Sequence, residues 1–140
     1  MDFVLLLGRI LFAALFISSG ISFHLLGLQG ATGYAQSKGV PMARLSVAIS
    51  GVLIIVGGLM ILFGVWADLG ALFLVAFLLP TALVMHNFWT QTDQQTRMME
   101  MVQFNKDIAL LGAALMIFVF YAKFGDDLGL HITDSLFTVD

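Results

Sequence analysis

The sequence contains no cysteine, and this absence excludes several kinds of chemistry. Disulfide bonds, thiolate nucleophiles and covalently attached c-type haem all require cysteine sulfur, so this chain cannot supply them. Thiol exchange through a Cys-x-x-Cys motif, as in four-helix disulfide-forming membrane enzymes, is excluded for the same reason. The absence leaves the redox compartment of the protein undecided.

Charge is also scarce, because only 11% of the residues are charged whereas 60% are hydrophobic. An ordinary soluble domain is about 25% charged. A water-soluble protein of 140 residues could not bury so much apolar surface, so the excess must face lipid. The net charge is −3 and the sequence has no block of basic residues, so it does not predict the basic surface that nucleic-acid binding requires. These observations predict an integral membrane protein with a single domain over residues 1–140.

Four apolar segments predict an all-α fold, an antiparallel four-helix membrane bundle with up-down topology. We expect spans over residues 3–26, 45–65, 69–89 and 105–124, followed by a polar tail over residues 125–140. The N-terminus lacks a positively charged region and a cleavage pattern, so we interpret it as the first span and not as a removable signal peptide.

The fourth apolar run, Ile108 to Ala122, is too short to cross a bilayer alone, since a span needs roughly 20 residues. We therefore expect Asn105, Lys106 and Asp107 to lie at the membrane edge. Residues 90–104, which precede them, are interpreted as an exposed loop with an amphipathic lead-in to the span.

Small residues and one proline predict how the spans pack. Ala14, Ser18 and Ser22 recur four residues apart and form a stripe that favours close packing of helices in lipid. Gly57 predicts the same close helix packing in the second span. Pro80 lacks a backbone donor and predicts a kink in the third span.

The connecting segments define two ends of the bundle. Residues 27–44 form a glycine-rich loop with a short surface helix around Tyr34 to Lys38, at the same end as the polar segment over residues 90–104. We call this the loop end, and the opposite end the terminal end. Four basic residues lie at the loop end and two at the terminal end, so the positive-inside rule predicts a cytoplasmic loop end.

Helix direction gathers most of the polar membrane-edge residues at the loop end. The first and third spans both finish there, and the second and fourth begin there. Ionisable residues inside a membrane are costly and usually indicate function. The candidate ligand-binding residues are His24, Arg44, His86, Asn87, Trp89, Lys106 and Asp107.

Three interpretations of this group remain open. His86, Asn87, Phe88 and Trp89 have the donors and the aromatic wall that a quinone head group requires. His24 and His86 on parallel spans could instead hold a b-type haem, which is the least favoured interpretation. The most favoured is an interfacial aromatic belt with a hydrogen-bond network at the helix ends. No group of residues has the spacing of a metal site.

Arg9 lies about two turns into the first span, near the terminal end. Its guanidinium either extends to lipid head groups or forms a structural ion pair with Asp68 or a tail carboxylate. Both interpretations make Arg9 structural, and they are favoured over a substrate site at this residue.

Several motifs together resemble the DoxX family of small bacterial membrane proteins. They are Arg9 in an apolar first span, Gly33–Ala35 and Gly39–Pro41 in the first loop, Gly57-Gly58-Leu59, His86 with Phe88-Trp89, and Phe104-x-Lys106-x-x-Ala109-Leu110-Leu111-Gly112. The match covers roughly residues 3–122, and its most specific part pairs His-x-Phe-Trp with Phe-x-Lys-x-x-Ala.

The sequence departs from the family pattern at three places. Asp107 stands where relatives often have asparagine, Ile54 where they often have glutamate, and Phe23 and His24 where a lysine is common. If that lysine and glutamate serve an activity in relatives, this chain either lacks the activity or uses His24 and Asp107 instead.

The resemblance implies a four-helix protein of the bacterial inner membrane. Some relatives are subunits of a thiosulfate:quinone oxidoreductase, and others take part in membrane responses to oxidative and thiol stress. This favours an accessory or anchor subunit of an oxidoreductase system, in which quinone is the cofactor left open. The alternative is a non-catalytic scaffold or assembly factor that recognises membrane proteins. The partners left open are lipid, a soluble or membrane redox protein, and a second copy of the chain.

Overall fold

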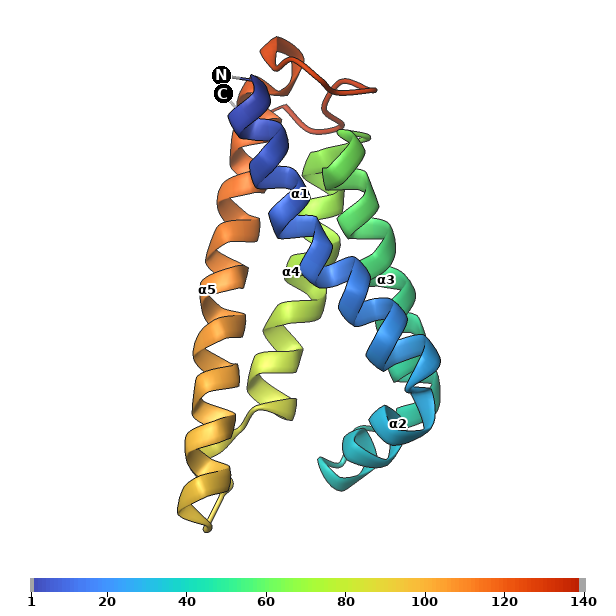
Figure 1. The fold of residues 1–140 in the computed structure, drawn as a ribbon, viewed down its shortest axis with the longest axis vertical. Coiled ribbons are helices and arrows are strands. Elements are labelled where there is room, and N and C mark those ends of the chain that lie inside the picture. Colours follow the sequence, from blue (N-terminus) through green and yellow to red (C-terminus); the bar gives the residue numbers. More distant parts are fainter. Residues whose placement is uncertain (1, 139–140) are drawn as a thin grey trace.

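The computed structural model describes residues 2–138, apart from the side chain of Asp126, and this part of the chain is helical without strands. Four helices in it are long and apolar enough to cross a membrane (Figure 1). They are α1 (Asp2–Ser19) with its continuation η1 (Gly20–Leu26), α3 (Ala43–Phe63), α4 (Ala67–Pro80) with its continuation η2 (Thr81–Met85), and α5 (Gln94–Phe124). The predicted all-α, four-helix membrane fold is confirmed.

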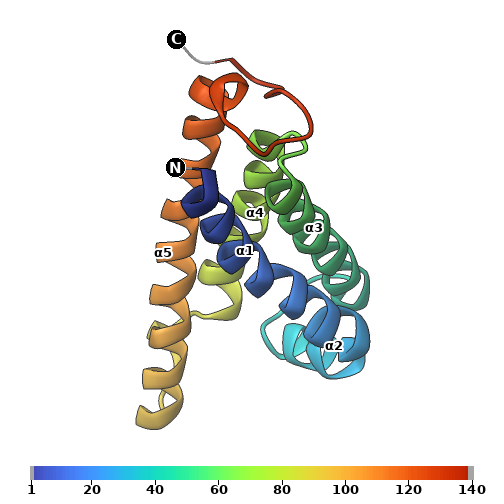
Figure 2. The ribbon, with the colours of Figure 1, turned by 45° about the horizontal axis from the view of Figure 1, so that its top comes forward.

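The helices pack in chain order. α1 contacts α3, α3 contacts α4, and α4 contacts α5. Successive spanning helices run in opposite directions, so the start of α1 and the end of α5 lie at the terminal end (Figures 1 and 2). The short helix α2 (Leu28–Ser37) lies at the loop end, as does the start of α5. The core contains Phe16, Ile54, Ile61, Ala71, Leu74, Leu78 and Ala114.

Glycines bring the backbones of neighbouring helices together, as the sequence predicted for Gly57. A Cβ added to Gly57 would lie 2.9 Å from the carbonyl oxygen of Gly70, and a Cβ added to Gly70 would lie 2.9 Å from the carbonyl oxygen of Gly57. Gly20 meets the carbonyl of Gly51 in a similar way. Such contacts suit lipid, where helix association depends on close packing.

The stripe predicted on the first span does not pack inside the bundle. Ala14, Ser18 and Ser22 are all exposed. The buried face of this span instead follows Arg9, Ala13, Phe16 and Gly20, which recur at helical spacings of three and four residues. The prediction was displaced by one position around the helix, because small residues alone do not show which face a helix presents to its neighbours.

The third span changes its helical geometry directly after Pro80. Proline cannot donate a hydrogen bond to the carbonyl of Ala76, and its ring crowds that carbonyl. The backbone continues as the π-helical segment η2, which closes with a bond from the His86 nitrogen to the Thr81 oxygen at 3.3 Å. Pro80 therefore ends the regular helix and sets the direction in which the chain presents His86.

Two segments expected to be irregular are ordered against the bundle. α5 begins at Gln94, early in the segment over residues 90–104 that was predicted as an exposed loop with an amphipathic lead-in, because Asp93 caps it by accepting from the Thr96 nitrogen at 2.8 Å. The tail crosses the terminal end, where the nitrogens of Ile132 and Thr133 both donate to the Gly64 oxygen.

Candidate functional site

Glu100 of α5 lies at the centre of a network of polar side chains at the loop end. Its Oε1 accepts a hydrogen bond from the Tyr34 hydroxyl at 2.5 Å, and its Oε2 lies 2.8 Å from His86 Nδ1. The Lys38 ammonium lies 3.7 Å from Oε1. We call Tyr34, Lys38, His86, Glu100 and Asp107 the polar cluster. It joins α2, the end of η2 and α5, which are far apart in the sequence.

Asp107 extends the cluster toward the interior of the bundle. It lies seven residues after Glu100, which is about two helical turns, so both carboxylates project from the same face of α5. Asp107 is buried, and its Oδ2 lies 3.7 Å from His86 Nε2. His86 is therefore placed between two carboxylates, one near the surface and one buried.

This arrangement can hold a mobile proton. A neutral imidazole carries one N–H, so it can donate to only one carboxylate, whereas a protonated imidazole can donate to both. Asp107 Oδ2 is buried and has no hydrogen-bond partner. A small movement of His86 toward Asp107 would provide one, because Nε2 now lies 3.7 Å from Oδ2, beyond hydrogen-bond distance.

A polar groove of about 440 Å³ opens beside the cluster. Lys38 lies in it and donates to the Asn87 side-chain oxygen at 2.9 Å. Burial and the hydrogen bond to the Glu100 carboxylate both raise the pKa of Tyr34, so its hydroxyl remains a donor. The groove is lined by Tyr34, Ser37, Lys38, Asn87, Thr90, Gln91, Thr96 and Glu100.

Three aromatic rings form a wall next to Asn87. Phe88, Trp89 and Phe104 meet edge to face, with ring centroids 5.2 to 5.6 Å apart. Trp89 is half exposed and does not line the polar groove. It has the position expected of an amphipathic ring at the membrane boundary.

The structure does not bring every predicted residue into the cluster. His24 contacts α3, where its Nδ1 lies 3.2 Å from the Val47 oxygen and 3.1 Å from the Ser50 hydroxyl. His24 and His86 therefore have separate partners on different elements. Arg44 is exposed in the first turn of α3 and does not line the polar groove.

Lys106 lies beside the cluster without entering it. Its ammonium is 3.4 Å from Asp107 Oδ1, and nearly half of its side chain is exposed. Its ammonium lies next to the buried carboxylate and partly offsets the negative charge of Asp107.

Arg9 and Asp68, the predicted ion-pair candidates, do not pair with each other. Each forms hydrogen bonds with backbone groups. Arg9 donates to the carbonyls of Ile61 and Leu62 at the end of α3 and to the Leu130 carbonyl at 2.7 Å. Asp68 is fully buried and accepts from the Phe137 nitrogen at 2.6 Å. Free carbonyls at a helix end need donors, and a planar guanidinium can supply several at once.

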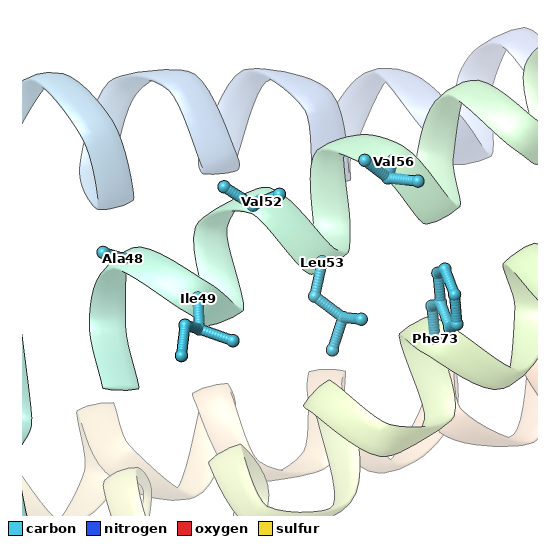
Figure 3. A pocket seen from close by; sticks show the side chains of 6 residues that line it. All are labelled: Ala48, Ile49, Val52, Leu53, Val56 and Phe73. Carbon is cyan, nitrogen blue, oxygen red and sulfur yellow. The ribbon is translucent and has the colours of Figure 1, made fainter. Parts of the chain in front are cut away.

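A second groove of about 370 Å³ lies between α3 and α4, and its side chains are all apolar (Figure 3). It can contact hydrocarbon, but it offers no side-chain hydrogen bond to a head group. Its lining consists of Ala48, Ile49, Val52, Leu53, Val56 and Phe73.

Sequence reasoning missed Glu100, the residue with the most partners in the cluster. The signal was available, because an Asp93 cap starts the last helix early and then places Glu100 and Asp107 on one face. Tyr34 and Lys38 were expected in a surface helix, but nothing in the sequence indicated that they reach α5. Among residues 2–138, no group of three or more His, Asp or Glu side chains has the geometry of a metal site.

Comparison with known proteins gives two matches. The DoxX family model matches residues 4–87, which is more than half of the chain and includes Tyr34, Lys38 and His86 but not Glu100 or Asp107. The inner membrane protein YphA of Escherichia coli (strain K12) is 28% identical over 114 residues, covering 81% of this chain and 80% of YphA. No solved structure matches the chain.

Proposed function

Because the chain belongs to the DoxX family, we propose that it is an accessory subunit of a membrane oxidoreductase system and binds a quinone at the polar groove. The chain is a multi-pass inner-membrane protein. Its role is to hold the quinone head group and exchange protons with it. The proposal extends to responses to oxidative or thiol stress, in which related proteins take part.

The observation that carries the proposal is the position of His86 between Glu100 and Asp107, next to the polar groove. Interconversion of quinone and quinol couples electron transfer to proton transfer. The cluster offers donors for carbonyl oxygens and acceptors for protons at the membrane edge. The chain has no cysteine, so it supplies no thiol for electron transfer, and a partner protein provides the electrons.

Quinone content tests this proposal directly. The protein is purified in mild detergent, and bound quinone is extracted with organic solvent and measured against protein concentration. We expect about one quinone per chain, and a loss of roughly tenfold in bound quinone in His86→Ala and Lys38→Met, since each removes a hydrogen-bond donor for a quinone carbonyl. Arg97→Gln is the matched control, because Arg97 is exposed on the same helix. Absence of quinone from the folded wild-type protein would rule out the proposal.

The alternative function, a scaffold for other membrane proteins, is favoured by one observation. The small-residue stripe of Ala14, Ser18 and Ser22 faces outward and is available to a helix of another chain. This function predicts a co-purifying membrane protein that is lost in Ser18→Leu, while bound quinone is absent. A single chain without a partner in mild detergent would exclude it.

A further inference from the structure

We infer that the phenol ring of Tyr34 occupies the place of the ligand's hydroxyl-bearing ring, so that a quinol binds by displacing Tyr34 from Glu100. This inference rests on the proposed function and specifies the reduced, hydroxyl-bearing form as the preferred ligand. Tyr34 lines the groove and competes with the ligand for the same carboxylate oxygen.

The contacts of Tyr34 are those that a quinol ring would make. Its hydroxyl donates to Glu100 Oε1, and the Lys38 ammonium lies 5.4 Å from the centre of its ring. A phenol and a quinol share the same chemistry here, since each is an aromatic ring with an O–H donor. A carboxylate accepts a hydrogen bond from the O–H group, and a cation near the ring is attracted to its π-electrons.

Tyr34 can leave without unpacking its helix. Tyr34 is 39% exposed, and its hydroxyl divides its single hydrogen between Glu100 and the Met85 carbonyl, 3.0 Å away. α2 is held to the bundle by other residues, since buried Ala35 packs with Ala43 and Val47 of α3. Displacement therefore costs the contacts of one half-exposed side chain.

The remaining cluster stays intact after displacement. Glu100 retains His86 at 2.8 Å on its other oxygen, and Lys38 remains bonded to Asn87. A ligand hydroxyl can then donate to the vacated Oε1 atom. An oxidised quinone has carbonyl oxygens and no O–H group, so it cannot form a hydrogen bond with that carboxylate oxygen. The geometry therefore predicts preference for the quinol over the quinone.

Binding of a soluble probe to the purified full-length protein tests the inference. The probes are decyl-benzoquinol and the matching decyl-benzoquinone, and the readout is fluorescence quenching of the protein, which has tryptophan at position 89 beside Asn87. In Tyr34→Phe we expect quinol affinity to rise on the order of tenfold, because the competing hydrogen bond to a charged group is lost. Quinone affinity should change much less. Gln36→Ala, exposed on the same helix and outside the groove lining, is the control.

The outcomes separate this inference from the proposed function. If wild-type protein binds both probes but Tyr34→Phe binds quinol no more tightly, Tyr34 is not a competitor and the inference is wrong. If neither form binds to wild type or to any folded variant, the proposed quinone site is wrong as well. Glu100→Gln should abolish the preference for quinol. Benzoquinol without the decyl tail shows whether the natural ligand is a free phenol or a membrane quinol. An affinity equal to that of decyl-benzoquinol indicates a free phenolic ligand, and a weaker affinity indicates a membrane quinol.

Discussion

At the scale of single residues, Gly51 determines where His24 lies. A Cβ at position 51 would overlap the Cβ of His24, so only glycine allows this histidine to approach α3 and meet the Val47 carbonyl. The hydrogen bonds of His24 satisfy a polar ring that would otherwise be costly near the membrane. His24 is thus explained by packing and hydrogen bonding within the bundle.

Replacement of Gly51 by alanine should therefore destabilise the protein. The added methyl group forces η1 and α3 apart, and we expect a loss of about 1–3 kcal/mol, as for other overpacked sites. Thermal unfolding in detergent measures the effect. Gly112→Ala is the control, because nothing lies within 4 Å of the position of its Cβ. Equal melting temperatures for the two variants would contradict this account of Gly51.

Prediction from sequence succeeded for residues whose position follows from helix direction. We expected to find four residues together at the loop end: His86, Asn87, Lys106 and Asp107. His86 and Lys106 both approach Asp107 there, and Asn87 accepts a hydrogen bond from Lys38 of the polar cluster. Prediction failed where helix rotation decides the contact. The sequence did not show that Tyr34 reaches Glu100, because the two are joined only by tertiary packing.

At the scale of elements, the start of α5 depends on its cap. Asp93 accepts from both the backbone nitrogen and the hydroxyl of Thr96, each at 2.8 Å. These bonds favour the ionised carboxylate and lower the pKa of Asp93. The cap orders the first two turns of the helix, which carry Glu100 toward the polar groove.

This cap should make the start of α5 sensitive to acid. Because the pKa of Asp93 is lowered by folding, its stabilisation is present above the ordinary pKa of aspartate, about 4, and is lost as the pH falls through the lower value in the folded protein. Hydrogen-exchange protection of the amides of residues 96 and 97, corrected for intrinsic rates, should fall in that range. Asp93→Asn still caps the helix but does not titrate, so its protection should not change with pH.

The apolar runs indicated the cores of the spans, whereas their ends depended on capping. The predicted second span over residues 45–65 lies close to the observed Ala43–Phe63, because glycine and proline mark its boundaries. The last helix begins well before residue 105, since hydropathy ignores a polar helical extension beyond the membrane. Local polar chemistry, not average hydrophobicity, set this boundary.

At the scale of the whole molecule, the two ends of the bundle carry different chemistry. The polar cluster and groove lie at the loop end, and Arg9 bonds to the tail at the terminal end. Figures 1 and 2 show the tail folded over that end of the bundle. The positive-inside rule places the loop end in the cytoplasm, and this orientation stays a prediction. It requires that protons and redox partners reach the polar groove from the cytoplasm.

Single-cysteine labelling can determine the orientation, because the native chain has no cysteine to remove. Gln95→Cys places a thiol at the exposed start of α5, and Ile132→Cys places one on the tail, where the side chain is 68% exposed. A membrane-impermeant maleimide added to intact cells, once past the outer membrane, should label position 132 and not position 95. Inverted vesicles should give the opposite pattern. The reverse result in both preparations would overturn the predicted orientation.

The contact between Arg9 and Leu130 has a consequence for biosynthesis. Arg9 leaves the ribosome well before its partner, because the carbonyl that completes its hydrogen bonding belongs to a residue made 121 positions later. Phe137, still later, supplies the donor for buried Asp68. The terminal end therefore cannot close until Leu130 and Phe137 have been synthesised, and until then the nascent protein stays in the membrane with an incompletely bonded arginine.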